Sequence, residues 1–75
     1  MNGTEFLQRV ADVIDYGGTL AVGQELADLE TWDSLGILSV VELLAELGVE
    51  ADIKALSAAK TTDDLLAIAS AVIDD

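Results

Sequence analysis

The residue that could most clearly take part in a chemical reaction is Ser34, which lies between the acidic Asp33 and the apolar Leu35. A serine hydroxyl is a weak nucleophile that usually depends on a neighbouring base such as histidine. The chain contains neither His nor Cys, so it lacks the usual general base near neutral pH and has no thiolate. We therefore expect the chain not to be an enzyme, and Ser34 to react only when a partner enzyme activates it.

The acidic residues are the second group that could have a functional role, through the binding of a partner. Fifteen Asp and Glu oppose three basic residues, giving a formal net charge of −12. Such a surface repels nucleic acid and anionic membranes and attracts basic protein surfaces, so we expect a protein partner rather than either of those. The acids that follow Ser34 are Glu42, Glu46, Glu50 and Asp52.

These four acids have two interpretations. The simpler one is a solvated surface, and the functional one is a docking surface for Arg and Lys of a partner, which the overall charge favours. No segment has the spacing of a calcium-binding EF-hand loop, so we do not expect a dedicated metal site.

The elements that must position these residues are helices. Hydrophobic residues form 52% of the chain, and there is no Pro to interrupt a helix. At 75 residues the chain forms one domain, residues 1–75. No apolar run reaches the ~18 residues of a membrane span, and the N-terminus lacks the pattern of a secretory signal. We expect a cytoplasmic, monomeric, free-standing protein, with a module cut from a longer chain as the alternative.

The first helix is expected from Thr4 to Tyr16, with Thr4 as its cap and Gly17 and Gly18 ending it. Its apolar face consists of Phe6, Val10, Val13 and Ile14. Residues 17–33 form a long connection rich in apolar residues, which we expect to pack across the bundle, with a helical turn near Leu26.

The second helix is expected to begin at Asp33 or Ser34 and to end near Leu47, with Gly48 just beyond it. Its inward stripe consists of Ile37, Val40, Val41, Leu44 and Leu47, while Leu35, Leu38 and Leu43 fall at its edges or outside it. Either Asp33 or Ser34 suits the cap position, so Ser34 has a purely structural explanation as well.

The last elements are a weak helical turn from Asp52 to Leu56 and a helix that starts at Thr61 and Thr62. Thr61 and Asp64 have the spacing of a capping box. The apolar face of this helix consists of Leu65, Ile68, Ala69, Val72 and Ile73. The pattern predicts an all-α fold, a small antiparallel bundle of three main helices plus a short one.

Trp32, Asp33, Ser34, Leu35 and Gly36, followed by a helix with the run Val40 to Leu44, resemble the acyl carrier protein family. The similarity extends from about Phe6 to Ile73, through Leu47 to Glu50 and the Thr61 and Thr62 pair. The Asp-Ser-Leu core alone is a weak signal. Its position at the start of the second helix of a short acidic chain makes the resemblance specific.

The resemblance implies that Ser34 accepts 4′-phosphopantetheine from coenzyme A through a phosphopantetheinyl transferase. The arm would carry acyl intermediates as thioesters to acyltransferase, ligase or synthase enzymes of fatty acid, polyketide or related biosynthesis. It implies that Asp33 and Leu35 flank the arm, and that Leu35, Leu38, Glu42, Glu46, Glu50 and Asp52 dock partners.

The sequence also allows two other functions. One is a carrier of an aminoacyl group such as D-alanine, although peptidyl carriers usually have His where Asp33 stands. The other is an acidic helical interaction module without a prosthetic group, in which Ser34 only caps a helix. Gly36 and Trp32 are also ambiguous. Gly36 either allows close approach of the arm or a partner or has drifted neutrally, and Trp32 either packs against the bundle or flanks the arm.

Overall fold

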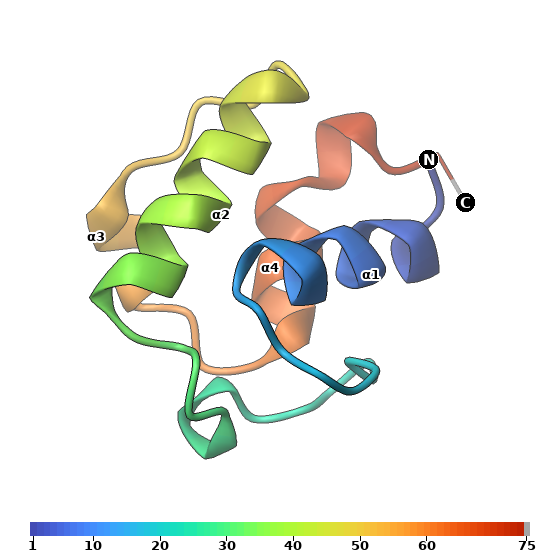
Figure 1. The fold of residues 1–75 in the computed structure, drawn as a ribbon. Helices are drawn as coiled ribbons and strands as arrows, with labels where there is room; N and C mark the ends of the chain where they lie inside the picture. The colour runs from blue at the N-terminus through green and yellow to red at the C-terminus, as the bar shows by residue number, and fades with distance from the viewer. Residues whose placement is uncertain (75) are drawn as a thin grey trace.

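The computed structural model describes residues 1–74, which form a small all-α bundle (Figure 1). The four α-helices are α1 (Gly3–Val13), α2 (Ser34–Glu46), α3 (Ile53–Ser57) and α4 (Thr62–Ile68). Two short 3₁₀ turns, η1 (Leu26–Asp28) and η2 (Ser70–Val72), complete it. The expected all-α class and bundle architecture are confirmed, although the fourth helix is shorter than the sequence pattern predicts.

The cap of α1 is Asn2 rather than Thr4, because the Asn2 Oδ1 accepts a hydrogen bond from the Glu5 N–H at 2.8 Å. The helix ends before the two glycines that were expected to stop it. Asp15 adopts a left-handed backbone with φ of 59°. The Tyr16 N–H then reaches back to the carbonyl of Ala11 at 2.9 Å, which closes the helix end. An aspartate tolerates this conformation better than most residues, so no glycine is needed.

The buried face of α1 differs from the expected one at its edges. Its buried residues are Phe6, Leu7, Val10, Ala11 and, just past the helix, Ile14. Val13 is 36% exposed, so its assignment to the apolar face was wrong. Successive residues of a helix are rotated by about 100° around its axis. The buried face of α1 is shifted toward Leu7 and Ala11, which leaves Val13 at its opposite edge.

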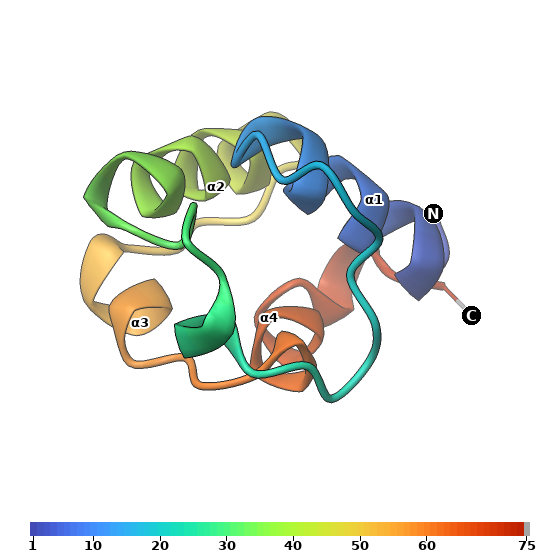
Figure 2. The ribbon, with the colours of Figure 1, turned by 60° about the horizontal axis from the view of Figure 1, so that its bottom comes forward.

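The connection between α1 and α2 packs across one end of the bundle, as expected, and contains η1 (Figure 2). Leu20, Leu26 and Leu29 are buried, whereas Val22 is 68% exposed. Backbone hydrogen bonds join the connection to the start of α4, from the Leu26 N–H to Lys60 O and from the Thr62 N–H to Gln24 O. The long connection is thereby held by α4.

The last residue before α2 that packs inward is Trp32, which is half-buried against the core. Of the two interpretations of Trp32, the structure shows the first, in which the side chain packs against the bundle.

α2 begins at Ser34 and ends as expected, with Gly48 in the left-handed region at φ 88° and the Val49 N–H bonded to Leu44 O at 2.8 Å. Its buried residues are Gly36, Val40, Leu43 and Leu44, while Ile37, Val41 and Leu47 are half-buried. Leu43, which the sequence pattern placed at the edge of the stripe or outside it, is only 5% exposed. The buried arc is rotated toward Gly36, which meets the end of α1.

The short α3 begins after Asp52, whose Oδ1 accepts from the Ala55 N–H at 2.7 Å. α4 begins after Thr61, and Asp64 Oδ2 accepts from the Lys60 and Thr61 N–H groups, the acidic half of the expected capping box. α4 ends at Ile68, earlier than expected, and the chain continues as η2. Leu65 and Ala69 are buried, but Ile68, Val72 and Ile73 are only half-buried.

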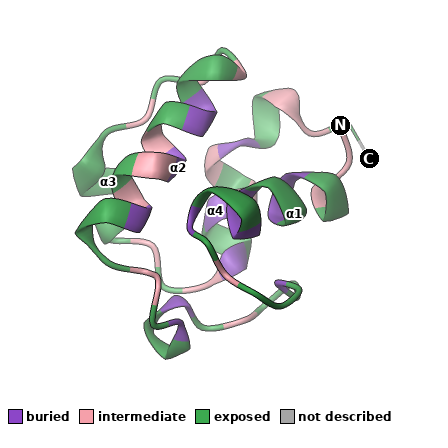
Figure 3. Ribbon diagram, viewed as in Figure 1, coloured by how far each residue is buried: buried purple, intermediate pink, exposed green. Residues whose placement is uncertain are grey.

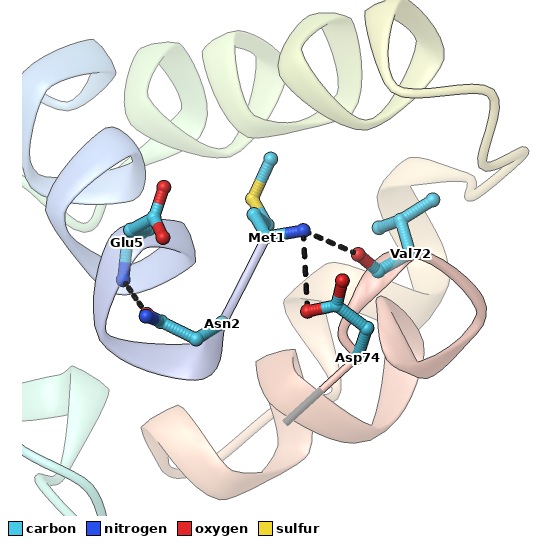
Figure 4. Close-up of polar contacts among 5 residues, drawn as sticks. All are labelled: Met1, Asn2, Glu5, Val72 and Asp74. Atoms are coloured by element: carbon cyan, nitrogen blue, oxygen red, sulfur yellow. Dashed lines mark hydrogen bonds and ion pairs between the residues drawn. The ribbon is translucent and has the colours of Figure 1, made fainter.

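Residues that are buried lie on the sides of the helices that face one another (Figure 3). Met1 and Asp74 lie next to each other (Figure 4). The Met1 ammonium lies 3.5 Å from Asp74 Oδ1, and the Asp74 N–H donates to Met1 O at 3.0 Å. Within residues 1–74, no helix is both long enough and apolar enough to span a membrane.

Candidate functional site

Ser34 is the first residue of α2 and is exposed. The cap is Asp33, whose Oδ1 accepts the Gly36 N–H at 2.9 Å. Across residues 1–74 the Ser34 hydroxyl forms no hydrogen bond. The structural explanation of Ser34 as the helix cap therefore does not apply, and its hydroxyl is exposed without a hydrogen-bond partner in the described chain.

The first two backbone N–H groups of α2, those of Ser34 and Leu35, have no intrahelical acceptor. Asp33 satisfies the third, that of Gly36. The 13-residue helix presents the positive end of its dipole here, and its first turn contains no acidic residue. A phosphate esterified to the Ser34 oxygen would thus meet two free amide donors and a favourable field.

Gly36 is required by the chain's own packing rather than by a ligand. A Cβ built on Gly36 would clash with the backbone carbonyl oxygen of Thr31 and would lie 3.4 Å from Ile14 Cγ2. The glycine lets the end of the long connection pass directly over the first turn of α2. This contact fixes where the chain enters the helix and therefore where Ser34 is presented.

Four of the six expected docking residues form one exposed stripe along α2. Leu35 and Leu38 are 75% and 42% exposed, and Glu42 and Glu46 are exposed one and two turns further along. Their spacing of three and four residues places them on the same face of the helix. The stripe therefore begins with apolar contacts beside Ser34 and ends with negative charge.

The other two expected docking residues lie past the end of α2. Glu50 and Asp52 are exposed and line an open groove together with Val41, Ala45, Val49 and Ala51. Asp52 also caps α3, a structural role that the sequence analysis did not assign to it. Beside it, Ile53 is 50% exposed and was missed as a surface residue. The sequence signal that could have indicated this exposed position is the acidic capping residue Asp52, because the residue directly after a cap lies at the exposed end of a helix.

A second open groove lies on the α1 side of Ser34. Its lining includes Val13, the last residue of α1, Asp15 just past that helix, Glu30 from the connection, and Asp33 and Leu35. Val13, Asp15 and Glu30 were missed by sequence reasoning. Val13 and Asp15 lie at the end of α1 and Glu30 lies in the connection, and no local pattern indicates that the fold brings these two segments together.

The carboxylates of these surfaces have no cationic partner. Among residues 1–74 the one ion pair joins the Met1 ammonium to Asp74, and Arg9, Lys54 and Lys60 form none. No three acidic side chains of this part of the chain converge closely enough to hold a metal ion. Away from the site, hydrogen bonds from the Lys60 and Thr61 N–H groups lower the pKa of the Asp64 carboxyl.

Comparisons of the chain with protein-family models, with curated proteins and with solved structures find no match. The site must therefore be interpreted from its own geometry. That geometry consists of a free hydroxyl at a helix N-terminus, with an exposed apolar and acidic stripe on the same helix.

Proposed function

We propose that this protein is a carrier that holds a reaction intermediate on a 4′-phosphopantetheine arm attached to Ser34. One observation carries the proposal. Ser34 is exposed at the first position of α2 and its hydroxyl has no partner across residues 1–74, because Asp33 serves as the cap. A serine with no structural task, placed beside a 75% exposed leucine, is suited to modification by another protein.

The residues present fit the arm. In the attachment step the Ser34 oxygen bonds to the phosphorus of the pantetheine phosphate of coenzyme A. The bond from that phosphorus to the nucleotide breaks, and adenosine 3′,5′-bisphosphate leaves. The hydroxyl proton passes to a base of the transferase, since this chain has no His or Cys to accept it. The free Ser34 and Leu35 amides would then hold a phosphate oxygen.

The arm, once attached, supplies a thiol that forms thioesters with a cargo. The chain itself presents the arm and selects the enzymes that meet it. Leu35 and Leu38 provide apolar contact beside the attachment point, and the acids further along α2 attract basic surfaces. Acyl groups are the proposed cargo, and an aminoacyl group would use the same site.

The test is intact mass spectrometry after incubation with coenzyme A and a broad-specificity phosphopantetheinyl transferase. The wild-type chain should gain the mass of one phosphopantetheine, and Ser34→Ala should gain none. Ser57→Ala, which removes another exposed serine at the end of α3, should be modified like wild type. A folded wild-type chain that gains no mass would contradict the proposal and favour an acidic interaction module without a prosthetic group.

A further inference from the structure

We propose that the groove between the end of α1 and the start of α2 receives an Arg or Lys side chain of the transferase that modifies Ser34. This inference rests on the proposed function. It extends the docking surface from the stripe on α2 across Ser34 to the opposite side, where Val13, Asp15 and Glu30 contribute.

Two of the residues that line the groove are exposed apolar side chains. Val13, from the last turn of α1, is 36% exposed, and Leu35, beside Ser34, is 75% exposed. Both line the same groove, although they are 22 positions apart in the chain. Exposed apolar side chains of this kind fit the aliphatic stem of an Arg or Lys side chain.

The groove is also acidic. Asp15, Glu30 and Asp33 line it, and none of them is paired with Arg9, Lys54 or Lys60. Only one oxygen of Asp33 is engaged, with the Gly36 N–H. A cationic head group above these apolar side chains would meet carboxylates from two segments, the end of α1 and the connection that leads into α2, so charge complementarity selects a basic side chain as the occupant.

Asp15 is unfavourable for the stability of α1 in two ways. Its φ of 59° is a conformation that glycine adopts at less cost. Its negative charge lies at the C-terminal end of α1, where the helix dipole favours a cation. Asp15 is exposed and buries no side-chain surface that would offset these costs. An external cation that meets its carboxylate would offset the unfavourable interaction with the helix dipole.

The new groove and the stripe on α2 are continuous, because Asp33 and Leu35 belong to the groove and flank Ser34 directly. A partner that contacts both would straddle the serine, with one contact on each side of the reacting hydroxyl. Two-sided contact would orient the hydroxyl toward the bound coenzyme A more closely than contact along α2 alone.

The experiment measures KM and kcat for phosphopantetheine transfer at low ionic strength, with far-UV circular dichroism to verify folding. Asp15→Asn combined with Glu30→Gln should raise KM about fivefold and leave kcat nearly unchanged, because rim charges act mainly on encounter. Asn retains the ability of residue 15 to adopt the left-handed backbone. Val13→Ser should also raise KM, through loss of an apolar contact.

The matched control for charge is Glu5→Gln combined with Asp63→Asn, which removes the same two charges from the first turns of α1 and α4. The matched control for apolar surface is Val22→Ser, at a 68% exposed position outside the groove. Both controls should keep KM within about twofold of wild type, as expected when only long-range attraction changes.

The outcomes separate the two proposals. If wild type is modified and the groove variants match their controls, the groove inference is wrong and the carrier function remains. If wild type is not modified at all, both are wrong. Support requires a rise in KM for the groove variants alone and a weaker salt dependence of KM in the Asp15 and Glu30 double variant.

Discussion

The first turns of α2 and α4 have the same local arrangement but opposite environments. Each helix starts with a capping residue, Asp33 or Thr61, followed by a hydroxyl residue, Ser34 or Thr62. Ser34 is exposed and its hydroxyl has no partner in the described chain, residues 1–74. Thr62 is fully buried.

The difference lies in what covers each first turn. The Thr62 hydroxyl donates to Ala21 O at 2.6 Å and accepts from the Gln24 N–H at 3.2 Å, so the long connection lies directly over it. Over α2 the chain passes instead beside Gly36, two residues further along, and leaves Ser34 uncovered. The identity of the hydroxyl residue does not decide its role, which depends on where the connection crosses the helix.

The largest effect is expected from Gly36→Ala, which would force the first turn of α2 and the Thr31 carbonyl apart. Because the clash involves backbone rather than a flexible side chain, we expect a loss of about 3 kcal/mol in the free energy of unfolding. Urea denaturation measures it. Gly17→Ala, at a position with nothing within 4 Å, is the control and should change stability little. Equal effects of the two variants would contradict the packing role of Gly36.

Thr62→Val should come next, with a loss of about 2 kcal/mol, because it leaves the Ala21 carbonyl and the Gln24 N–H without their side-chain partner. Thr62→Ser keeps the hydroxyl and should recover part of the loss. Ser34→Ala should be nearly neutral in the same denaturation assay. A comparable loss for Ser34→Ala would show that the two hydroxyls do not differ in the way described.

Asp33→Ala should cost about 1 kcal/mol, because it leaves the Gly36 N–H at the start of α2 without its cap. Asp33→Asn keeps an acceptor oxygen and should retain most of the stability. The midpoint of thermal unfolding, followed by circular dichroism, distinguishes the three chains. If Asp33→Ala were neutral, Ser34 or water would have to satisfy the cap instead.

The smallest effect concerns pH and the start of α4. The pKa of Asp64 is lowered in the folded chain by the backbone N–H groups of Lys60 and Thr61. Its contribution to stability is therefore present above its unfolded pKa, near pH 4, and is lost as pH falls through the lower folded pKa. Wild type should be more stable than Asp64→Asn at pH 7, and the difference should shrink toward pH 2. A difference independent of pH would contradict this role.

The helices could be predicted from the sequence because their signals are local. Apolar spacing located α1, α2 and α4, and only a weak helical turn was expected where α3 lies. Gly48 marked the end of α2, and Asp64 marked the capping box of α4. The end of α1 could not be predicted, because Asp15 adopts a conformation for which Gly17 and Gly18 were the better candidates. Leu43 and Val13 were misplaced because burial at the edge of a stripe depends on neighbouring segments.

The candidate site likewise contains residues that could be predicted from the sequence and residues that could not. Asp33, Ser34 and Leu35 are adjacent in the chain, so a short motif was enough to find them. Whether Asp33 or Ser34 capped α2 was ambiguous, because both residue types accept hydrogen bonds at that position. The groove formed by Val13, Asp15 and Glu30 depends on a tertiary contact between the two helices, and no spacing in the sequence reports it.

The bonds between the long connection and α4 have a consequence for folding kinetics. Ala21 and Gln24 find their partner in Thr62, 41 and 38 residues later. Contacts with such a long sequence separation close a large loop, and they are slow to form because of its entropy. During vectorial synthesis α1 and α2 would emerge first, with the connection between them still unrestrained. The part of the connection around Ala21 and Gln24 would acquire its final setting only after Thr62 has left the ribosome.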